Sequence, residues 1–96
     1  MDNQKQQAIY EVTQQRLIPR LLEVMNDEVT QEFMEMKRKD VINFHFGFGL
    51  WIRNNMLYND DELFDTFMAA GYMDADDMSM YILEQLYDYL HAADKK

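Results

Sequence analysis

The sequence contains no cysteine, a single proline and three glycines among its 96 residues. A chain without cysteine has no disulfide, no thiolate nucleophile and no cysteine-based zinc site, and it fits a reducing compartment. With so few proline and glycine residues, the tight turns of a hairpin-connected sheet are not expected. No apolar run reaches the roughly 18 residues of a membrane span, and the polar start has no signal-peptide core. We therefore expect a helical protein of the cytoplasm, neither secreted nor inserted in a membrane.

Basic residues are also scarce: nine Lys and Arg stand against 18 Asp and Glu, and the net charge is −9. The deficit is regional, because residues 60–94 hold ten acidic residues and no Lys or Arg, whereas residues 1–59 hold eight acidic and seven basic residues. Such a charge opposes direct binding to nucleic acid and to anionic membranes. It favours a basic protein partner, although solubility alone explains an acidic surface equally well.

Apolar side chains, by contrast, are abundant. Hydrophobic residues make up 48% of the sequence and aromatic residues 14%, which is ample for one packed core in a chain of this length. Their spacing is helical nearly throughout. We predict an all-α protein with a single domain over 1–96, folded as a compact bundle of four or five helices. Its Gln-rich start, 1–7, is the part most open to fraying.

Local signals divide the N-terminal part into two helices. The first is expected over about 4–25. Pro19 makes either a kink or a fresh helix start in it, because proline cannot donate to the carbonyl four residues back. The second helix is short, has Asn26 or Asp27 as its N-cap, and is closed by the basic run 37–39, which suits the negative end of a helix dipole.

The third segment, 41–57, is rich in phenylalanine and is predicted as one helix at the centre of the bundle, capped by Asp40. Its Phe residues also alternate as in a strand. About 17 residues are long for a strand, however, so the length of the segment decides for a helix. Gly47, which has no Cβ, would let another helix cross closely, or Gly47 and Gly49 together would accommodate a kink.

Two helices are expected in the acidic C-terminal part. Asn59 or Asp60 begins the first, and Gly71 ends it because glycine readily takes the positive φ of a helix end. After a loop at 72–76, the last helix runs over about 77–92 and packs against the Phe-rich helix. Its apolar residues cover a wide arc, which predicts burial on two sides.

Two stretches of the sequence form recognisable motifs. The first is NFHFGFGLWIRNN at 43–55, and the second is Asp-Asp-Met-Ser at 76–79. Together they resemble an uncharacterised bacterial family of small proteins, a domain of unknown function, that carries an HFGxGxWIRN-like pattern and later a PDDxS-like helix start. The resemblance covers about 40–91, and Ala75 stands where the family pattern has proline. It implies a helical fold and a bacterial or phage origin, and it implies no activity.

The sequence does not match the motifs of known catalytic and metal sites. His45 and His91 each lack a second histidine at i+3 or i+4, so a zinc site is not expected. A calcium loop beginning at Asp74 would need Gly and Glu where the chain has Ser79 and Gln85, so the acidic residues here are interpreted as helix caps. Ser79, the only serine, has no histidine near it in sequence. We predict no enzyme activity, no metal and no cofactor.

The motif around Arg53, the only basic residue in 40–94, has two interpretations. The favoured one is structural, with an ion pair between Arg53 and Asp76 or Asp77. His45 is likewise interpreted as a hydrogen-bonded structural histidine. The alternative is a pocket that contacts a ligand or a partner. The residues of this alternative site are His45, Arg53, Asn54 and Asn55.

The function that these observations favour is protein binding. Nine methionines and the many aromatic residues exceed what one small core needs, and both classes are common at protein interfaces. We expect the acidic, tyrosine-bearing region 60–94 to dock on a basic protein surface, as inhibitors, immunity proteins and anti-defence proteins do. The alternatives are a homo-oligomeric structural protein and a small ligand-binding protein that uses His45, Arg53 and Asn55. The predicted partner-binding residues are Asp60, Asp61, Glu62, Asp74, Asp76, Asp77, Tyr81, Glu84 and Asp88.

Overall fold

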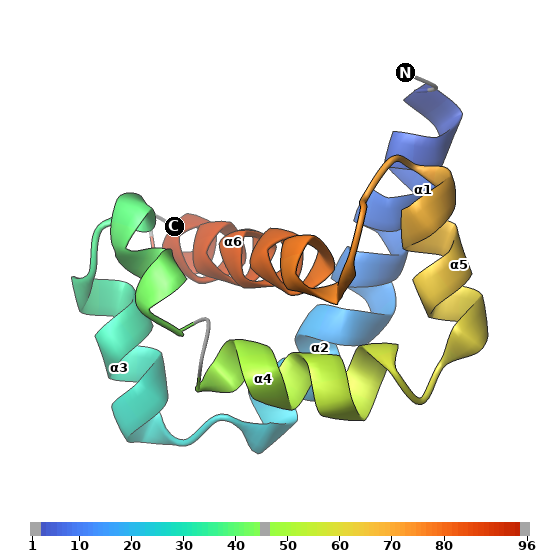
Figure 1. Ribbon diagram of the computed structural model, residues 1–96. Helices are drawn as coiled ribbons and strands as arrows, with labels where there is room; N and C mark the ends of the chain where they lie inside the picture. The colour runs from blue at the N-terminus through green and yellow to red at the C-terminus, as the bar shows by residue number, and fades with distance from the viewer. Residues whose placement is uncertain (1–2, 45–46, 95–96) are drawn as a thin grey trace.

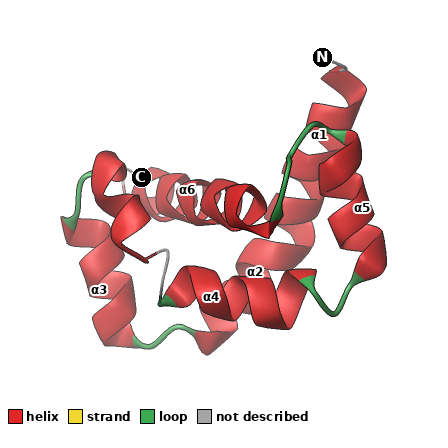
Figure 2. Ribbon diagram, viewed as in Figure 1, coloured by secondary structure: helices red, strands yellow, loops and turns green. Residues whose placement is uncertain are grey.

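The computed structural model describes residues 3–44 and 47–94, and all regular structure in these ranges is helical. Six α-helices are present there, together with two π-helical segments and one 3₁₀-helix. The all-α prediction is confirmed. Figure 1 shows the helices gathered around one long central helix, and Figure 2 shows that the loops between them are short. Within the described ranges, no helix is both long enough and apolar enough to cross a membrane.

The N-terminal helices form one continuous rod: α1 (Asn3–Val12), the π-helical segment η1 (Thr13–Leu17) and α2 (Ile18–Val24). In η1 the backbone N–H of Ile18 donates to the carbonyl of Thr13, five residues back. Pro19 follows directly in the first turn of α2 and has no N–H to donate. Pro19 therefore lies in the first turn of α2, as a helix start would place it, but the helix is not interrupted there because a π-helical turn keeps the helical path unbroken.

Helix α3 (Asp27–Glu35) is short and begins with the predicted cap. The side-chain oxygen of Asn26 accepts a hydrogen bond of 2.8 Å from the backbone N–H of Val29, which satisfies one of the free donors at the helix start. The helix ends before the basic run that was expected to close it. Arg38 instead begins the 3₁₀-helix η2 (Arg38–Phe44).

The prediction of one continuous helix over 41–57 is wrong. The chain forms η2, then the turn residue Gly47, then α4 (Phe48–Ile52), which continues as the π-helical segment η3 (Arg53–Leu57). Gly47 has φ −94° and ψ −92°, outside the helical region. Two glycines within three residues weaken a helix, each by roughly 1 kcal/mol relative to alanine. Asp40 lies inside η2 and does not cap a helix that starts at Val41.

Helix α5 (Asp61–Ala69) has well-defined signals at both ends. Asp60 accepts a hydrogen bond of 3.1 Å from the backbone N–H of Leu63, as predicted for the cap. Gly71 has φ +102°, as predicted for the helix end. The N–H groups of Gly71 and Tyr72 donate to the carbonyls of Met68 and Phe67, which is the Schellman arrangement. The ring of Tyr72 consequently packs edge-on against Phe67, with centroids 5.4 Å apart.

The longest helix, α6 (Ala75–Asp94), is the centre of the fold. It contacts α2, α3, α4 and the segments η1, η2 and η3, and Figure 1 shows it running through the middle of the molecule. The predicted burial on two sides is confirmed, but the Phe-rich segment is not the central helix. The largest fully buried side chains are Phe33, Phe67, Ile9, Ile18, Leu21, Ile52, Met56, Leu57, Met78, Ile82, Leu83 and Leu86.

Candidate partner-binding surface

Arg53 is buried and bonded to the start of α6. Its Nε lies 3.4 Å from Oδ1 of Asp76, and its guanidinium donates to Oγ of Ser79 at 3.1 Å. Ser79 in turn donates to the carbonyl of Asp76 at 3.0 Å. The predicted ion pair is confirmed, with Asp76 as the partner. Arg53 thereby holds η3 against the first turns of α6, and it presents little of its side chain to solvent.

Gly49 makes room for this arginine. A Cβ placed on Gly49 would lie 3.2 Å from the carbonyl oxygen of Phe44, 3.3 Å from the Arg53 guanidinium and 3.5 Å from Leu83 of α6. A Cβ on Gly47 would meet nothing within 4 Å. The close approach predicted at Gly47 therefore occurs at Gly49, because the turn at Gly47 carries that residue away from α6.

The other residues of the alternative ligand site give that interpretation little support. His45 lies outside the described residues. Asn54 is exposed, and the side-chain amide of Asn55 donates to the carbonyl of Trp51 at 2.9 Å, one turn back. Of the described residues in this motif, Arg53 is thus the one that joins η3 to α6, while Asn55 bonds within its own helix.

Two of the predicted partner-binding acids cap helices. Asp60 caps α5, and its carboxylate also lies 3.8 Å from the guanidinium of Arg16. Asp74 accepts a hydrogen bond of 3.0 Å from the backbone N–H of Asp77, so the capping predicted for this acidic stretch is confirmed. Both residues thus stabilise the start of a helix.

Glu84 and Asp88 are paired with Arg38, which sequence reasoning had placed at a helix end. Nε of Arg38 lies 3.0 Å from Oδ1 of Asp88, and a guanidinium nitrogen lies 3.4 Å from Glu84. A second guanidinium nitrogen donates to Asp88 at 3.2 Å, so this pair is bidentate. The hydrogen bonds to Asp88 are the main reason why the pKa of Arg38 is raised. Part of the predicted acidic surface is therefore neutralised within the chain.

The remaining acids stay exposed. In the described residues, Asp61, Glu62 and Asp65 on α5 and Asp77 on α6 are exposed and form no ion pair with Lys, Arg or His. Asp65 was not among the predicted binding residues. These four residues define what we call the acidic face. Its charge reaches solvent without a counter-ion from the described part of the chain, which distinguishes it from Asp76, Glu84 and Asp88.

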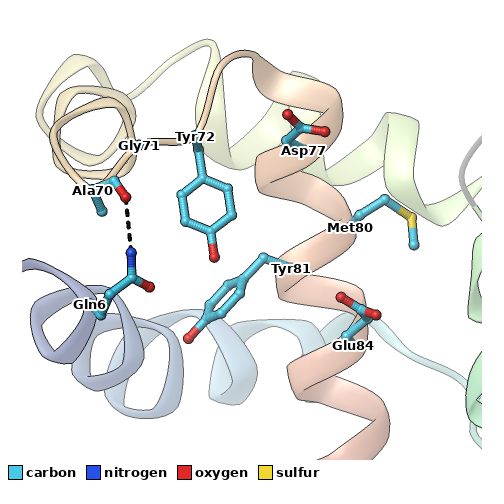
Figure 3. Close-up of a pocket in the computed structure, with 8 residues that line it drawn as sticks. All are labelled: Gln6, Ala70, Gly71, Tyr72, Asp77, Met80, Tyr81 and Glu84. Carbon is cyan, nitrogen blue, oxygen red and sulfur yellow. Dashed lines mark hydrogen bonds between the residues drawn. The ribbon is translucent and has the colours of Figure 1, made fainter. Parts of the chain in front are cut away.

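A pocket of about 480 Å³ opens where α1, the turn after α5, and α6 meet (Figure 3). The rings of Tyr72 and Tyr81 cross edge to face in its wall, with centroids 5.5 Å apart. The amide of Gln6 donates to the carbonyl of Ala70 at 2.9 Å and ties α1 to this turn. We call it the tyrosine pocket. Its lining residues are Gln6, Ala70, Gly71, Tyr72, Asp77, Met80, Tyr81 and Glu84.

The pKa values of both tyrosines in the pocket are raised. Burial, then the neighbouring Tyr72 and Tyr10, raise the pKa of Tyr81 to about 12. Burial, then the charges of Glu84 and Asp77, raise the pKa of Tyr72. At neutral pH both hydroxyls therefore remain able to donate a hydrogen bond. The sequence already indicated Tyr72 and Tyr81 as tyrosines of the acidic region, but it did not indicate Gln6, which lies more than sixty residues away in the chain.

A second, apolar pocket of about 430 Å³ lies between the α2–α3 turn and the Phe-rich segment. Val24, one of its lining residues, is 50% exposed. Sequence reasoning expected surplus apolar surface without locating it. The lining residues are Val24, Met25, Asn26, Val29, Phe44, Gly47, Phe48 and Trp51.

Comparison with known proteins gives a family but no activity. The sequence model described as "Domain of unknown function (DUF6794)" matches residues 6–90, a span that includes the lining of both pockets. The match begins in α1, well before the motif-based resemblance at about residue 40. No curated protein and no solved structure matches the chain. Because the matched span covers most of its length, the chain belongs to the DUF6794 family.

Proposed function

We propose that this protein is a protein-binding module that docks on a basic partner through the acidic face and the adjoining tyrosine pocket. The observation that carries the proposal is the exposed position of Asp61, Glu62, Asp65 and Asp77, which no cation of the described residues neutralises. Complementary charge of this kind speeds association and selects among partners.

Fewer acidic residues support the proposed docking than the sequence indicated. Glu84 and Asp88 are engaged by Arg38, and Asp76 by Arg53, so their charges act mainly within the chain. Tyr72 and Tyr81 add half-buried aromatic surface beside Asp77. Tyrosine gives large contact areas at low entropic cost and is enriched at interfaces.

The proposal assigns the protein to binding rather than catalysis. Within this class we propose an inhibitor, immunity protein or anti-defence protein of bacteria or phage that acts in the cytoplasm and without a cofactor. Such a protein would cover a basic functional surface of its target, and electrostatic attraction would raise the rate of association.

Affinity purification from the native host at low and high salt, with two charge-matched variants, tests the proposal. One variant neutralises the acidic face on α5 (Asp61→Asn, Glu62→Gln, Asp65→Asn). The control neutralises Glu23, Glu28 and Glu32, three exposed acids of α2 and α3. We expect a basic partner whose capture falls at high salt and falls about tenfold or more with the first variant only. A partner without a basic surface, or equal loss with both variants, would contradict the proposal.

One observation favours a second function, homo-oligomerisation. The apolar pocket is lined in part by the exposed side chain of Val24, and an apolar patch is chemically complementary to the same patch on a second copy. Light scattering across a range of protein concentrations tests this candidate. A dimer that dissociates when Val24 is changed to Lys would support it, and a monomer at high concentration would exclude it.

A further inference from the structure

We propose that the tyrosine pocket receives one arginine side chain of the basic partner. This inference rests on the proposed function and deepens it, because it assigns the recognition of a particular side chain to a particular cavity.

The lining of the tyrosine pocket is rich in acceptors and contains no cation. Asp77 and Glu84 each bring a carboxylate, and Lys, Arg and His are absent from its eight lining residues. Glu84 shares its charge with Arg38 at 3.4 Å, whereas Asp77 forms no ion pair among the described residues. The pocket therefore has an excess of negative charge that a single cation would balance. Asp77 is its main source.

The aromatic wall favours a planar cation. Tyr72 and Tyr81 cross at 69°, and both are only partly buried. A guanidinium group stacks on a tyrosine ring and directs five N–H donors toward acceptors in its plane. The neighbouring acceptors are the two carboxylates, the phenol oxygens and the side-chain oxygen of Gln6, whose nitrogen is held by Ala70 (Figure 3). A lysine ammonium has three donors and no plane, so it uses this surface less well.

The negative field of the carboxylates already acts on the pocket. Glu84 and Asp77 contribute to the raised pKa of Tyr72, after burial as the first cause. Negative charge that disfavours a phenolate at this position favours a guanidinium at the same position. The volume of about 480 Å³ is within the usual range for ligand pockets, so a long side chain and part of its backbone can enter.

The pocket is formed before any partner arrives. Tyr72 is fixed by the turn at Gly71 and by its ring contact with Phe67. Tyr81 contacts the same Phe67 at 5.9 Å. The hydrogen bond from Gln6 to Ala70 holds the opposite wall. Few side chains of the pocket need to become ordered when an arginine binds. The affinity for arginine is therefore higher than it would be on a flexible acidic surface.

Three synthetic peptides test the inference: an alternating Gly-Arg octapeptide, and the same peptide with lysine or with citrulline in place of arginine. Binding to the full chain is followed at low salt by amide chemical shifts in two-dimensional NMR. We expect the arginine peptide to shift the signals of Tyr72, Asp77 and Tyr81 and to bind several-fold more tightly than the lysine peptide. Uncharged citrulline should not bind.

Two matched pairs of variants locate the binding. Asp77→Asn should weaken the arginine peptide about tenfold, as expected for loss of a charge-assisted hydrogen bond. Asp65→Asn removes the same charge from α5 outside the pocket and should change affinity less than about twofold. Tyr72→Phe keeps the ring and should retain most of the binding, whereas Tyr72→Leu keeps the bulk and should lose it. Unchanged amide spectra outside the pocket confirm that each variant folds.

The outcomes separate this inference from the proposed function. Equal binding of the arginine and lysine peptides, with equal losses for Asp77→Asn and Asp65→Asn, would show a general acidic surface. The proposed function would then stand and the arginine pocket would be rejected. If neither basic peptide binds at low salt, both are rejected. Arginine-selective binding that depends on Asp77 and on the Tyr72 ring supports both.

Discussion

Nε of Arg53 lies 3.4 Å from Oδ1 of Asp76, yet the arginine side chain is 7% exposed and the aspartate side chain 61%. The pair therefore bridges the interior and the surface. The buried guanidinium is held by Ser79 from within and by a carboxylate that water still reaches. This arrangement connects the Phe-rich motif to the helix that organises the fold.

Replacing Arg53 with methionine should destabilise the protein by about 2 kcal/mol, because the charge-assisted hydrogen bonds to Asp76 and Ser79 are lost while most of the buried volume is retained. Urea unfolding followed by circular dichroism measures the change. Arg20→Met, at an exposed position of α2, is the control and should alter stability by less than about 0.5 kcal/mol. Equal effects at both positions would mean that the contacts of Arg53 are not stabilising.

Gly49→Ala should destabilise the protein by about 1–3 kcal/mol, since the new methyl group would press on Phe44, Arg53 and Leu83 in a packed interior. Gly47→Ala is the matched control, because a methyl group there meets nothing within 4 Å. Thermal and urea unfolding of the two variants give the comparison. A larger loss at Gly47 than at Gly49 would contradict the packing described here.

Thr13→Val should stabilise the protein by about 1 kcal/mol. The hydroxyl of Thr13 is fully buried in η1 and has no hydrogen-bond partner among the described residues, so a methyl group of nearly the same shape removes a desolvation cost. Thr13→Ser, which keeps the hydroxyl and leaves a small cavity, should be destabilising. If valine lowers the unfolding free energy instead, the hydroxyl has a partner that the structure does not show.

Stability should fall as the pH rises from about 10 to about 12. The pKa of Tyr81 is raised from 10.0 to about 12 in the folded protein, so the folded state keeps this proton after the unfolded chain has released it. The raised pKa of Tyr81 therefore contributes to the free energy of unfolding. This contribution is complete below pH 10 and is lost as the pH approaches the pKa of the folded state. Urea unfolding at about pH 9 and about pH 11 should show the decrease, and Tyr81→Phe should reduce it. An unchanged decrease in that variant would assign the effect to other groups.

Arg38→Gln should strengthen binding to a basic peptide, because it releases the carboxylates of Glu84 and Asp88 from their bidentate partner. The cost in stability should be below about 1 kcal/mol, since these side chains are partly exposed to solvent. Peptide titration at low salt measures the gain. Lys39→Gln, which removes the same charge without an ion pair among the described residues, is the control and should give a smaller gain.

Features with a local cause were predictable from the sequence. Asn26 and Asp60 cap helices and Gly71 takes a positive φ, because each of these residue types satisfies a requirement of the adjacent backbone. An ion pair between Arg53 and Asp76 or Asp77 was predictable for another reason: few cations were available for the many acids of the C-terminal part. Only the structure selected Asp76 of the two.

The break at Gly47 and the site of close packing at Gly49 were not predictable in the same way. Helical periodicity continues through 41–57, and only the competition between that helix and contacts with α6 decides where the chain turns. Likewise, the ion pair between Arg38 and Asp88 could not be predicted, because fifty residues separate them in the chain. The sequence therefore indicated more unpaired carboxylates on the acidic surface than the structure contains.

The sequence by itself determined that the protein is helical, acidic toward its C-terminus and capped at defined residues, because these properties depend on composition and on neighbours along the chain. Only the tertiary structure decided that α6 is the central helix, which carboxylates remain without an internal cation, and that Gln6, Tyr72 and Tyr81 meet in one pocket. These outcomes depend on how the helices pack. Several helix faces are similarly apolar in the sequence, and only close packing decides which of them are buried against one another.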